Sequence, residues 1–176
     1  MGKNYKEYLS NITTFIFDVD GVLASDQLLV TSSGELLRSM HSKDGMAIKI
    51  AIKKGFNVAI ISGGTNEGVR KRLEGLDVKD IYLGISDKIE TYKKYVDLKN
   101  LDPENVLYMG DDLSDYELMQ VIGLPCAPQD AIPEIKAISK YVSHKKGGKG
   151  CARDVIEQVL KVQGKWMTEF KTKQRS

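Results

Sequence analysis

Carboxylate side chains occur in two short segments of the chain, and each segment directly follows an apolar run. Asp18 and Asp20 lie two residues apart in DVDG, after the β-branched and aromatic run at 13–17. The second segment, DDLSD at 111–115, follows the apolar run NVLYMG. Close carboxylates repel each other unless a counter-charge lies nearby, and Mg²⁺ prefers oxygen ligands of this kind. A lone DxD is typical of a solvated turn, but its pairing with a second acidic segment predicts a magnesium site.

The two acidic segments need a scaffold that brings them together, and the rest of the sequence predicts one. Strand-like runs occur at 13–17, 57–62, 80–83, 105–110, 123–127 and 141–143. Helical patterns lie between them at 44–54 with Asp44 as cap, from the glycine turn after Ser62 to about 73, from Ser86 to about 100, at 114–121, from Pro133 and at 151–163. This alternation predicts an α/β fold, a doubly wound Rossmann-like parallel sheet in a single domain over 1–176. Ligands bind beyond the carboxyl ends of such strands, where both acidic segments and the sequence SGG at 62–64 fall.

One stretch departs from this alternation. Apolar positions alternate on either side of SSG, and Gly34 can supply the positive φ of a turn, so we expect a β-hairpin with arms at 22–31 and 35–41. The last residues, 164–176, are expected to form a tail in which Trp166 and Phe170 either reach a neighbouring protomer or fray.

Composition excludes several classes of partner. The chain has 176 residues, 41% of them hydrophobic and 28% charged, and a formal charge of +2 without a dense basic stripe, which argues against binding to nucleic acid. No apolar run is long enough to cross a bilayer, so we expect no membrane association. Cys126 and Cys151 have the spacing of neither a zinc site nor a disulfide scaffold. We therefore expect reduced thiols and a cytosolic protein.

Four motifs occur in a fixed order along the chain: DVDGV at 18–22, Ser62 after a strand, Lys88 at the start of a helix, and GDDLSD at 110–115. Each is weak alone, but the ordered set resembles the haloacid dehalogenase superfamily of phosphatases. The resemblance implies that Asp18 attacks phosphorus to form an aspartyl-phosphate and that Asp20 is the general acid and base.

The same resemblance implies the other site residues. Mg²⁺ is expected to bind a side-chain oxygen of Asp18, the main-chain carbonyl of Asp20 and the carboxylate of Asp111. Asp112 and Asp115 are expected to orient ligands or water. The hydroxyl of Ser62 and the ammonium of Lys88 would hold the oxygens of the transferring phosphoryl group.

Larger members of this superfamily carry a cap domain, for which this chain has no room, because only 43 residues separate Asp18 from Ser62 and 25 separate Ser62 from Lys88. The hairpin, HSKDG at 41–45 and GGKG at 147–150 resemble the capless branch that acts on 3-deoxy-D-manno-octulosonate 8-phosphate. The residues that this resemblance places around a sugar-acid phosphate are Asp20, His41, Ser42, Lys43, Asp44, Gly45, Lys49, Ser62, Gly63, Gly64, Arg72 and Lys88. Arg72 has an alternative role, pairing with Glu67 or Glu74 on a solvated helix.

Gly64 departs from the branch, whose members often carry Arg there, while similar phosphatases of nonulosonate 9-phosphates can carry Glu. A nine-carbon substrate therefore stays open as an alternative. A receiver-like domain that only accepts a phosphoryl group is disfavoured, because Asp20 would speed its hydrolysis. A non-catalytic scaffold is disfavoured by the complete motif set.

The resemblance also implies assembly. Members of the branch are homotetramers whose hairpins help to close a neighbour's site, and an open site without a cap favours such closure. The apolar hairpin residues Leu28, Leu29, Val30, Leu36 and Leu37 either contact a partner or pack on the protomer's own sheet.

Overall fold

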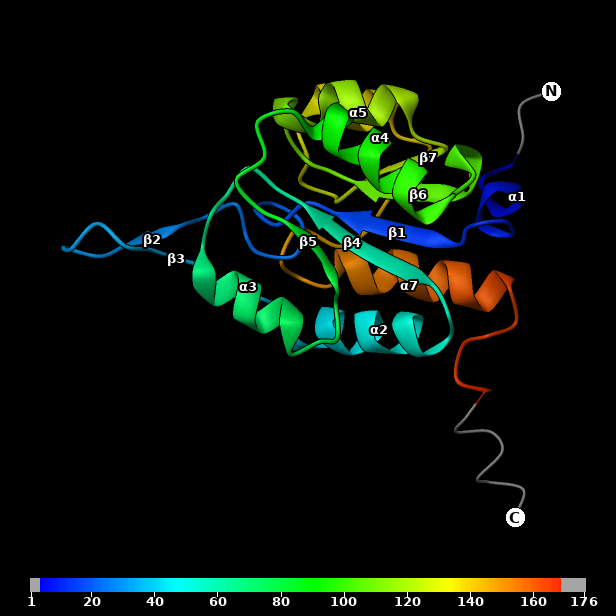
Figure 1. The fold of residues 1–176 in the computed structure, drawn as a ribbon, viewed down its shortest axis with the longest axis horizontal. Coiled ribbons are helices and arrows are strands. Elements are labelled where there is room, and N and C mark those ends of the chain that lie inside the picture. The colour runs from blue at the N-terminus through cyan, green and yellow to red at the C-terminus, as the bar shows by residue number, and fades with distance from the viewer. Residues whose placement is uncertain (1–3, 169–176) are drawn as a thin grey trace, which may run out of the picture.

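A six-stranded parallel sheet forms the centre of the computed structural model, which describes residues 4–168 (Figure 1). In chain order the strands are β1 (Thr14–Phe17), β4 (Asn57–Ile61), β5 (Asp80–Tyr82), β6 (Val106–Met109), β7 (Leu124–Ala127) and β8 (Tyr141–Val142). They lie in the order β5-β4-β1-β6-β7-β8, and all five ladders are parallel. The predicted doubly wound α/β fold is therefore confirmed.

Helices cover both faces of this sheet. The helices are α1 (Tyr5–Leu9), α2 (Ser42–Lys53), α3 (Glu67–Glu74), α4 (Lys88–Lys99), α5 (Tyr116–Val121), α6 (Pro133–Ile138) and α7 (Cys151–Val162), with short 3₁₀ turns η1 (Pro103–Asn105) and η2 (Leu113–Asp115). Phe15 and Phe17 of β1 pack in the layer with α2 and α7, whereas Ile16 packs in the layer with α4 and α5 (Figure 1). Burial of both faces explains why the central strands are continuous apolar runs.

Three helices begin at other residues than the sequence predicts. One is α5, which begins at Tyr116 rather than at 114, because the 3₁₀ turn η2 occupies Leu113–Asp115. Asp87, rather than Ser86, caps α4, because its side chain accepts a hydrogen bond from the N–H of Glu90 at 2.8 Å. Helix α2 begins at Ser42, two residues before Asp44, so Asp44 is not its cap.

The carboxylate of Asp44 instead reaches a neighbouring helix. Its Oδ1 accepts a hydrogen bond from the N–H of Arg153 at 2.8 Å, in the first turn of α7. The N-cap of α7 is Gly150, which has no side chain with which to cap the helix. Asp44 therefore accepts a hydrogen bond from a free N–H group in the first turn of α7, although the two residues are 109 positions apart in the sequence.

The predicted hairpin is present, but its paired part is short. Strands β2 (Leu29–Val30) and β3 (Leu36–Leu37) form a two-stranded sheet that projects away from the body of the molecule (Figure 1). The arms do not pair continuously over 22–31 and 35–41 as predicted: besides the β2–β3 ladder, the described arms share one isolated antiparallel bridge, between Ala24 and Met40, and Ala24 also bridges to Asp20 of the active-site loop. The apolar side chains of the projecting part are exposed, Leu29 by 66% and Val30 by 63%.

The end of the described chain packs on its own protomer. Trp166 is half-buried against the core, and the guanidinium of Arg153 lies 5.5 Å from its ring centre. Phe170, the other aromatic residue of the predicted tail, lies outside the described residues. Helix α1 was not predicted, and within 4–168 none of the helices is both long and apolar enough to span a membrane.

Candidate active site

The carboxyl ends of β1, β4 and β6 meet at one edge of the sheet, and an open pocket of about 240 Å³ lies beyond them. Its lining comes from the segments that follow these strands and from Lys88, the first residue of α4, which follows β5. The lining residues are Asp18, Asp20, Asp26, Ser62, Gly63, Gly64, Lys88, Asp111, Asp112 and Ser114. The predicted nucleophile, acid and phosphate-binding residues are therefore brought together, as the order of the motifs indicates.

Lys88 lies at the centre of a buried network. Its Nζ lies 2.9 Å from Oδ2 of Asp18 and 2.6 Å from Oδ1 of Asp115. These three side chains are 6%, 7% and 0% exposed, respectively. Burial lowers the pKa of Lys88, but the two carboxylates outweigh burial and raise the pKa above its usual value. The ammonium therefore stays charged between Asp18 and Asp115.

Asp115 has every oxygen engaged by the protein. Oδ1 accepts from Lys88 and from the hydroxyl of Tyr108, at 2.5 Å, while Oδ2 accepts from the N–H groups of Asp111 and Asp112. Burial, followed by the charge of Asp115, raises the pKa of Tyr108 far above its usual value. The phenol therefore stays protonated and donates a hydrogen bond to Asp115. Asp115 thus holds both Lys88 and the main chain at Asp111 and Asp112 in position.

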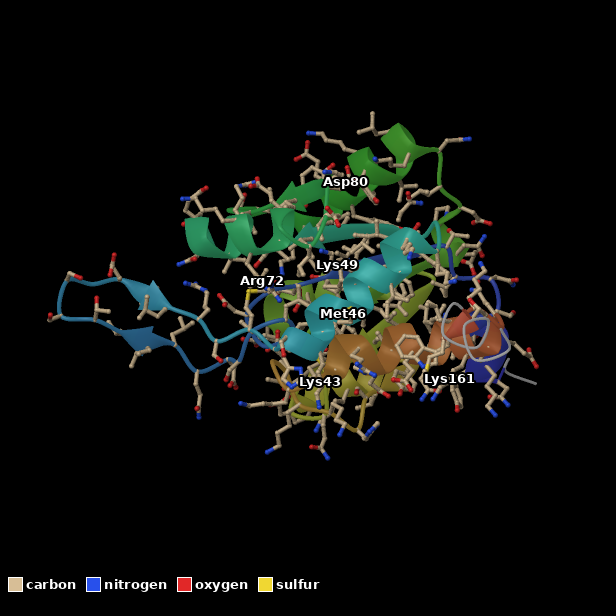
Figure 2. The ribbon with its side chains drawn as sticks, turned by 90° about the horizontal axis from the view of Figure 1, so that it is seen from below. Lys43, Met46, Lys49, Arg72, Asp80 and Lys161 are labelled. Atoms are coloured by element: carbon tan, nitrogen blue, oxygen red, sulfur yellow. The ribbon has the colours of Figure 1, made fainter. Side chains whose placement is uncertain are left out.

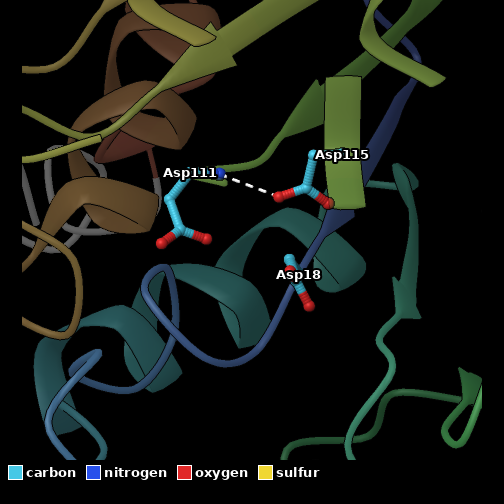
Figure 3. Close-up of side chains that lie close together, drawn as sticks. All are labelled: Asp18, Asp111 and Asp115. Atoms are coloured by element: carbon cyan, nitrogen blue, oxygen red, sulfur yellow. Dashed lines mark hydrogen bonds between the residues drawn. The ribbon is translucent and has the colours of Figure 1, made fainter. Parts of the chain in front are cut away.

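Asp111 differs from Asp115, because its Oδ1 is buried and has no hydrogen-bond partner. Gly21, at φ +82°, makes room for this carboxylate: a Cβ at residue 21 would overlap it. Figure 3 shows the Asp111 carboxylate close to Asp18 and Asp115, and one oxygen of each lies within 4.8 Å of the others.

This cluster fits a divalent cation. Burial, and then repulsion by Asp115, raises the pKa of Asp18 to about 6 against the attraction of Lys88. Burial, and then repulsion by Asp115 and Asp18, raises the pKa of Asp111 to about 8. When all three carboxylates are ionised, the one ammonium leaves two negative charges uncompensated, and Asp111 contributes a buried oxygen that has no hydrogen-bond partner. Carboxylate oxygens are the donors that Mg²⁺ prefers.

Asp20 is held by a residue that the sequence did not indicate. The guanidinium of Arg38, at the base of the hairpin, binds both oxygens of Asp20, with Nε at 2.9 Å from Oδ1 and Nη2 at 3.1 Å from Oδ2. Tyr108 was also missed, because it was treated only as a strand residue. A polar tip inside a fully buried strand is itself a signal, since a buried phenol usually has a partner.

The phosphate-binding positions of the second motif lie at the end of β4. Ser62 is 2% exposed, and its N–H donates to the carbonyl of Tyr82 in the neighbouring strand β5. Gly63 and Gly64 follow it in the pocket wall. A Cβ at Gly64 would lie 3.4 Å from Oδ2 of Asp20, which is van der Waals contact with this carboxylate.

The remaining predicted substrate residues lie outside this pocket in the single chain. His41 and Lys43 line a separate cavity of about 530 Å³ beside α7. Lys49, on the outer face of α2 seen in Figure 2, pairs with Asp77 at 3.7 Å, and the Arg72 guanidinium covers Gly45. Ser42 is exposed and Asp44 caps α7. Their contact with substrate stays a prediction.

Comparison with known proteins places this site in a family. Residues 80–153 match the model of the haloacid dehalogenase-like hydrolases. The 3-deoxy-D-manno-octulosonate 8-phosphate phosphatase KdsC of Salmonella typhi is 37% identical over 155 residues, covering 88% of this chain and 82% of that protein.

Solved structures agree with the sequence relatives. The crystal structure of the 3-deoxy-D-manno-octulosonate 8-phosphate phosphatase from Yersinia pestis has a TM-score of 0.91 and 33% identity, covering 96% of this chain and 91% of that one. The Moraxella catarrhalis enzyme in complex with magnesium, phosphate and KDO has a TM-score of 0.90 and 27% identity, with 95% and 96% covered. The chain belongs to the KdsC family of haloacid dehalogenase-like phosphatases, which are phosphoric monoester hydrolases.

Proposed function

We propose that the chain is a Mg²⁺-dependent phosphatase that converts 3-deoxy-D-manno-octulosonate 8-phosphate to 3-deoxy-D-manno-octulosonate and phosphate through a phosphorylated Asp18. One observation carries the proposal: the buried ammonium of Lys88 lies between Asp18 and Asp115, and these two carboxylates cluster with Asp111, whose buried Oδ1 has no hydrogen-bond partner. Relatives that bear the name of this activity support the choice of substrate.

In the first step an oxygen of Asp18 forms a bond to phosphorus while the bond from phosphorus to the sugar oxygen breaks. Asp20 gives its proton to the departing sugar oxygen, and its place in the same pocket, two residues beyond the nucleophile, supports this role. In the second step water attacks phosphorus, its proton passes to Asp20, and Asp18 is released as a carboxylate.

The groups around Asp18 hold the phosphoryl oxygens in line. The Lys88 ammonium offers positive charge at 2.9 Å from Asp18, and the Ser62 hydroxyl lines the same pocket. Mg²⁺ would be held by the carboxylates of Asp18 and Asp111 with the main-chain carbonyl of Asp20, and when bound it neutralises charge on the transferring group. Asp115 supports Asp111 by accepting a hydrogen bond from its N–H, whereas Asp112 accepts from the N–H of Leu113.

The substrate is tested by release of inorganic phosphate. We expect the highest kcat/KM with 3-deoxy-D-manno-octulosonate 8-phosphate, no activity in chelator, and recovery with added Mg²⁺. The alternative is a nine-carbon nonulosonate 9-phosphate, which Gly64 leaves open because it adds no side chain to the pocket wall. A higher kcat/KM with the nine-carbon phosphate would replace the proposed substrate and keep the mechanism. Phosphate release by Asp18→Asn at the wild-type rate would remove the mechanism.

We further propose a homotetramer in which each hairpin closes a neighbour's active site. The exposed hairpin side chains support it: Leu28, Leu29, Val30, Leu36 and Leu37 are 38–66% exposed in the single chain. Leu29→Asp and Leu36→Asp should give smaller particles in light scattering and lower activity with an unchanged circular dichroism spectrum. Leu98→Asp is the control, because Leu98 is 74% exposed on α4, away from the hairpin. A fully active wild-type monomer would contradict shared sites.

Two further parts of the proposal concern the whole chain. We propose that 1–176 forms one domain, supported by the single six-stranded sheet through the described residues. We also propose a cytoplasmic location, supported by the two buried cysteines, which are free thiols.

A further inference from the structure

The pocket around Asp18 is rich in carboxylates and poor in cations. Among the described residues that line it, Lys88 is the one cation, while the acidic residues are Asp18, Asp20, Asp26, Asp111 and Asp112. Lys88 is already engaged by Asp18 and Asp115. A sugar acid phosphate brings a carboxylate as well as a phosphate, and the carboxylate requires a positive partner of its own.

Arg38 is a second cation close to the pocket, and not all of its N–H groups donate hydrogen bonds to other described residues. Its Nε and Nη2 donate to Asp20, and its Nη1 donates to the carbonyl of Leu36 at 2.8 Å. A guanidinium has five N–H groups, so two remain beyond these three bonds, one on Nη1 and one on Nη2. The Arg38 side chain is 8% exposed, and Asn66 fixes the same segment by donating to the carbonyl of Leu36 at 3.2 Å.

Gly64 leaves an opening between the pocket and this guanidinium. The position that a Cβ would take at Gly64 lies 3.5 Å from Nη2 of Arg38, 3.4 Å from Oδ2 of Asp20 and 4.0 Å from Oγ of Ser62. Gly64 lines the pocket that contains Asp18 and also a smaller recess that contains Arg38. A substrate oxygen in this space would lie between the Ser62 hydroxyl and the guanidinium.

We propose that Arg38 binds the carboxylate of the substrate through the space at Gly64, while the same guanidinium keeps its contact with Asp20. Arg38 is then a specificity-determining residue that selects acidic sugar phosphates over neutral ones. The inference rests on the proposed function, because it requires a substrate that carries a carboxylate.

Two variants test it by different routes, each measured with 3-deoxy-D-manno-octulosonate 8-phosphate and with ribose 5-phosphate, which lacks the carboxylate. Arg38→Met removes the cation, and Gly64→Ala fills the opening but leaves Arg38 beside Asp20. Because Arg38 also holds Asp20, Arg38→Met should lower kcat for both substrates, so the test is the ratio of the two kcat/KM values. We expect both variants to lower kcat/KM for the sugar acid phosphate by roughly 10- to 100-fold more than for ribose 5-phosphate, with this additional loss mainly in KM. Arg38→Lys keeps the charge and should recover part of the loss.

Controls of the same type are available on α3. Arg70→Met removes an arginine that pairs with Glu67 at 4.0 Å on the surface, and Gly75→Ala adds a Cβ at an ordinary 3.5 Å from its neighbours; both should keep wild-type kinetics. If the wild type prefers the sugar acid phosphate and both Arg38→Met and Gly64→Ala retain that preference, the inference fails alone. If the wild type shows no preference for the carboxylate, both the inference and the proposed substrate fail.

Discussion

The Lys88 ammonium lies 2.9 Å from Oδ2 of Asp18, with both side chains almost fully buried. Lys88→Met would leave Asp18 and Asp115 as buried carboxylates without their shared cation. In chelator we expect the free energy of unfolding to fall by about 3–5 kcal/mol in urea denaturation, and activity to be lost. Lys94→Met, which removes an exposed pair with Glu90 on the same helix, should change stability little. Equal stability of Lys88→Met and wild type would contradict the buried network.

The hydroxyl of Tyr108 donates a hydrogen bond to Asp115, and removing this hydroxyl alone tests whether it positions the site. Tyr108→Phe removes one donor to Asp115 and leaves the ring in place, so we expect kcat to fall about tenfold and the unfolding free energy to fall by about 1–2 kcal/mol. Tyr92→Phe is the matched control, because the Tyr92 hydroxyl is buried without a hydrogen-bond partner. It should keep kcat and lose no stability. Similar kinetics for the two variants would show that the Tyr108 hydroxyl does not position the site.

The unpaired oxygen of Asp111 predicts that Mg²⁺ stabilises the folded chain. At a free Mg²⁺ concentration of about 100 times Kd, binding adds about 2.7 kcal/mol, which raises Tm by roughly 5–10 °C for a chain of this size. Calorimetry with and without chelator measures the shift. Asp111→Asn should abolish it. Asp112→Asn should retain it, because the exposed Asp112 caps the N–H of Leu113. An equal Mg²⁺ shift in Asp111→Asn would place the ion elsewhere.

The two cysteines are predicted to be unreactive in the native protein. Cys126 and Cys151 are fully buried, and burial, the largest cause, raises the pKa of each thiol well above its usual value. A raised pKa means less thiolate at a given pH, and thiolate is the reactive form. At pH 8 we expect reaction with a thiol reagent to be on the order of 10³-fold slower than in guanidinium, because the fold must open first. Rapid native labelling of either thiol would contradict this burial.

Sequence patterns predicted the parts of the molecule that depend on local order. The strands are continuous apolar runs because both faces are buried, and the motifs follow their carboxyl ends, so the meeting of Asp18, Ser62, Lys88 and Asp111 followed from parallel pairing. Helix starts were predicted less accurately: Ser86 and Asp87 are both good N-cap residues, and the structure shows that Asp87 accepts the capping hydrogen bond from Glu90.

Contacts between distant segments were beyond sequence patterns. Asp44 accepts a hydrogen bond from the N–H of Arg153, 109 residues away, and the guanidinium of Arg38 binds Asp20, 18 residues before it. Neither partner can be read from spacing, because the geometry exists only after the sheet has formed. The length of the paired hairpin strands was also overestimated. Alternating apolar residues predict a strand with one apolar face, but they do not show what covers that face, and in the single chain the apolar side chains of the hairpin are exposed.

The central claim is that the phosphoryl group passes through Asp18, and trapping the intermediate tests it most directly. The wild-type enzyme is mixed with 3-deoxy-D-manno-octulosonate 8-phosphate and Mg²⁺, quenched in acid within the first turnover, and reduced with borohydride, which converts an aspartyl-phosphate to homoserine. Peptide mass spectrometry should find homoserine at position 18 and Asp at positions 20 and 111. Turnover with no modification at position 18, or with modification at another carboxylate, would contradict the proposed mechanism.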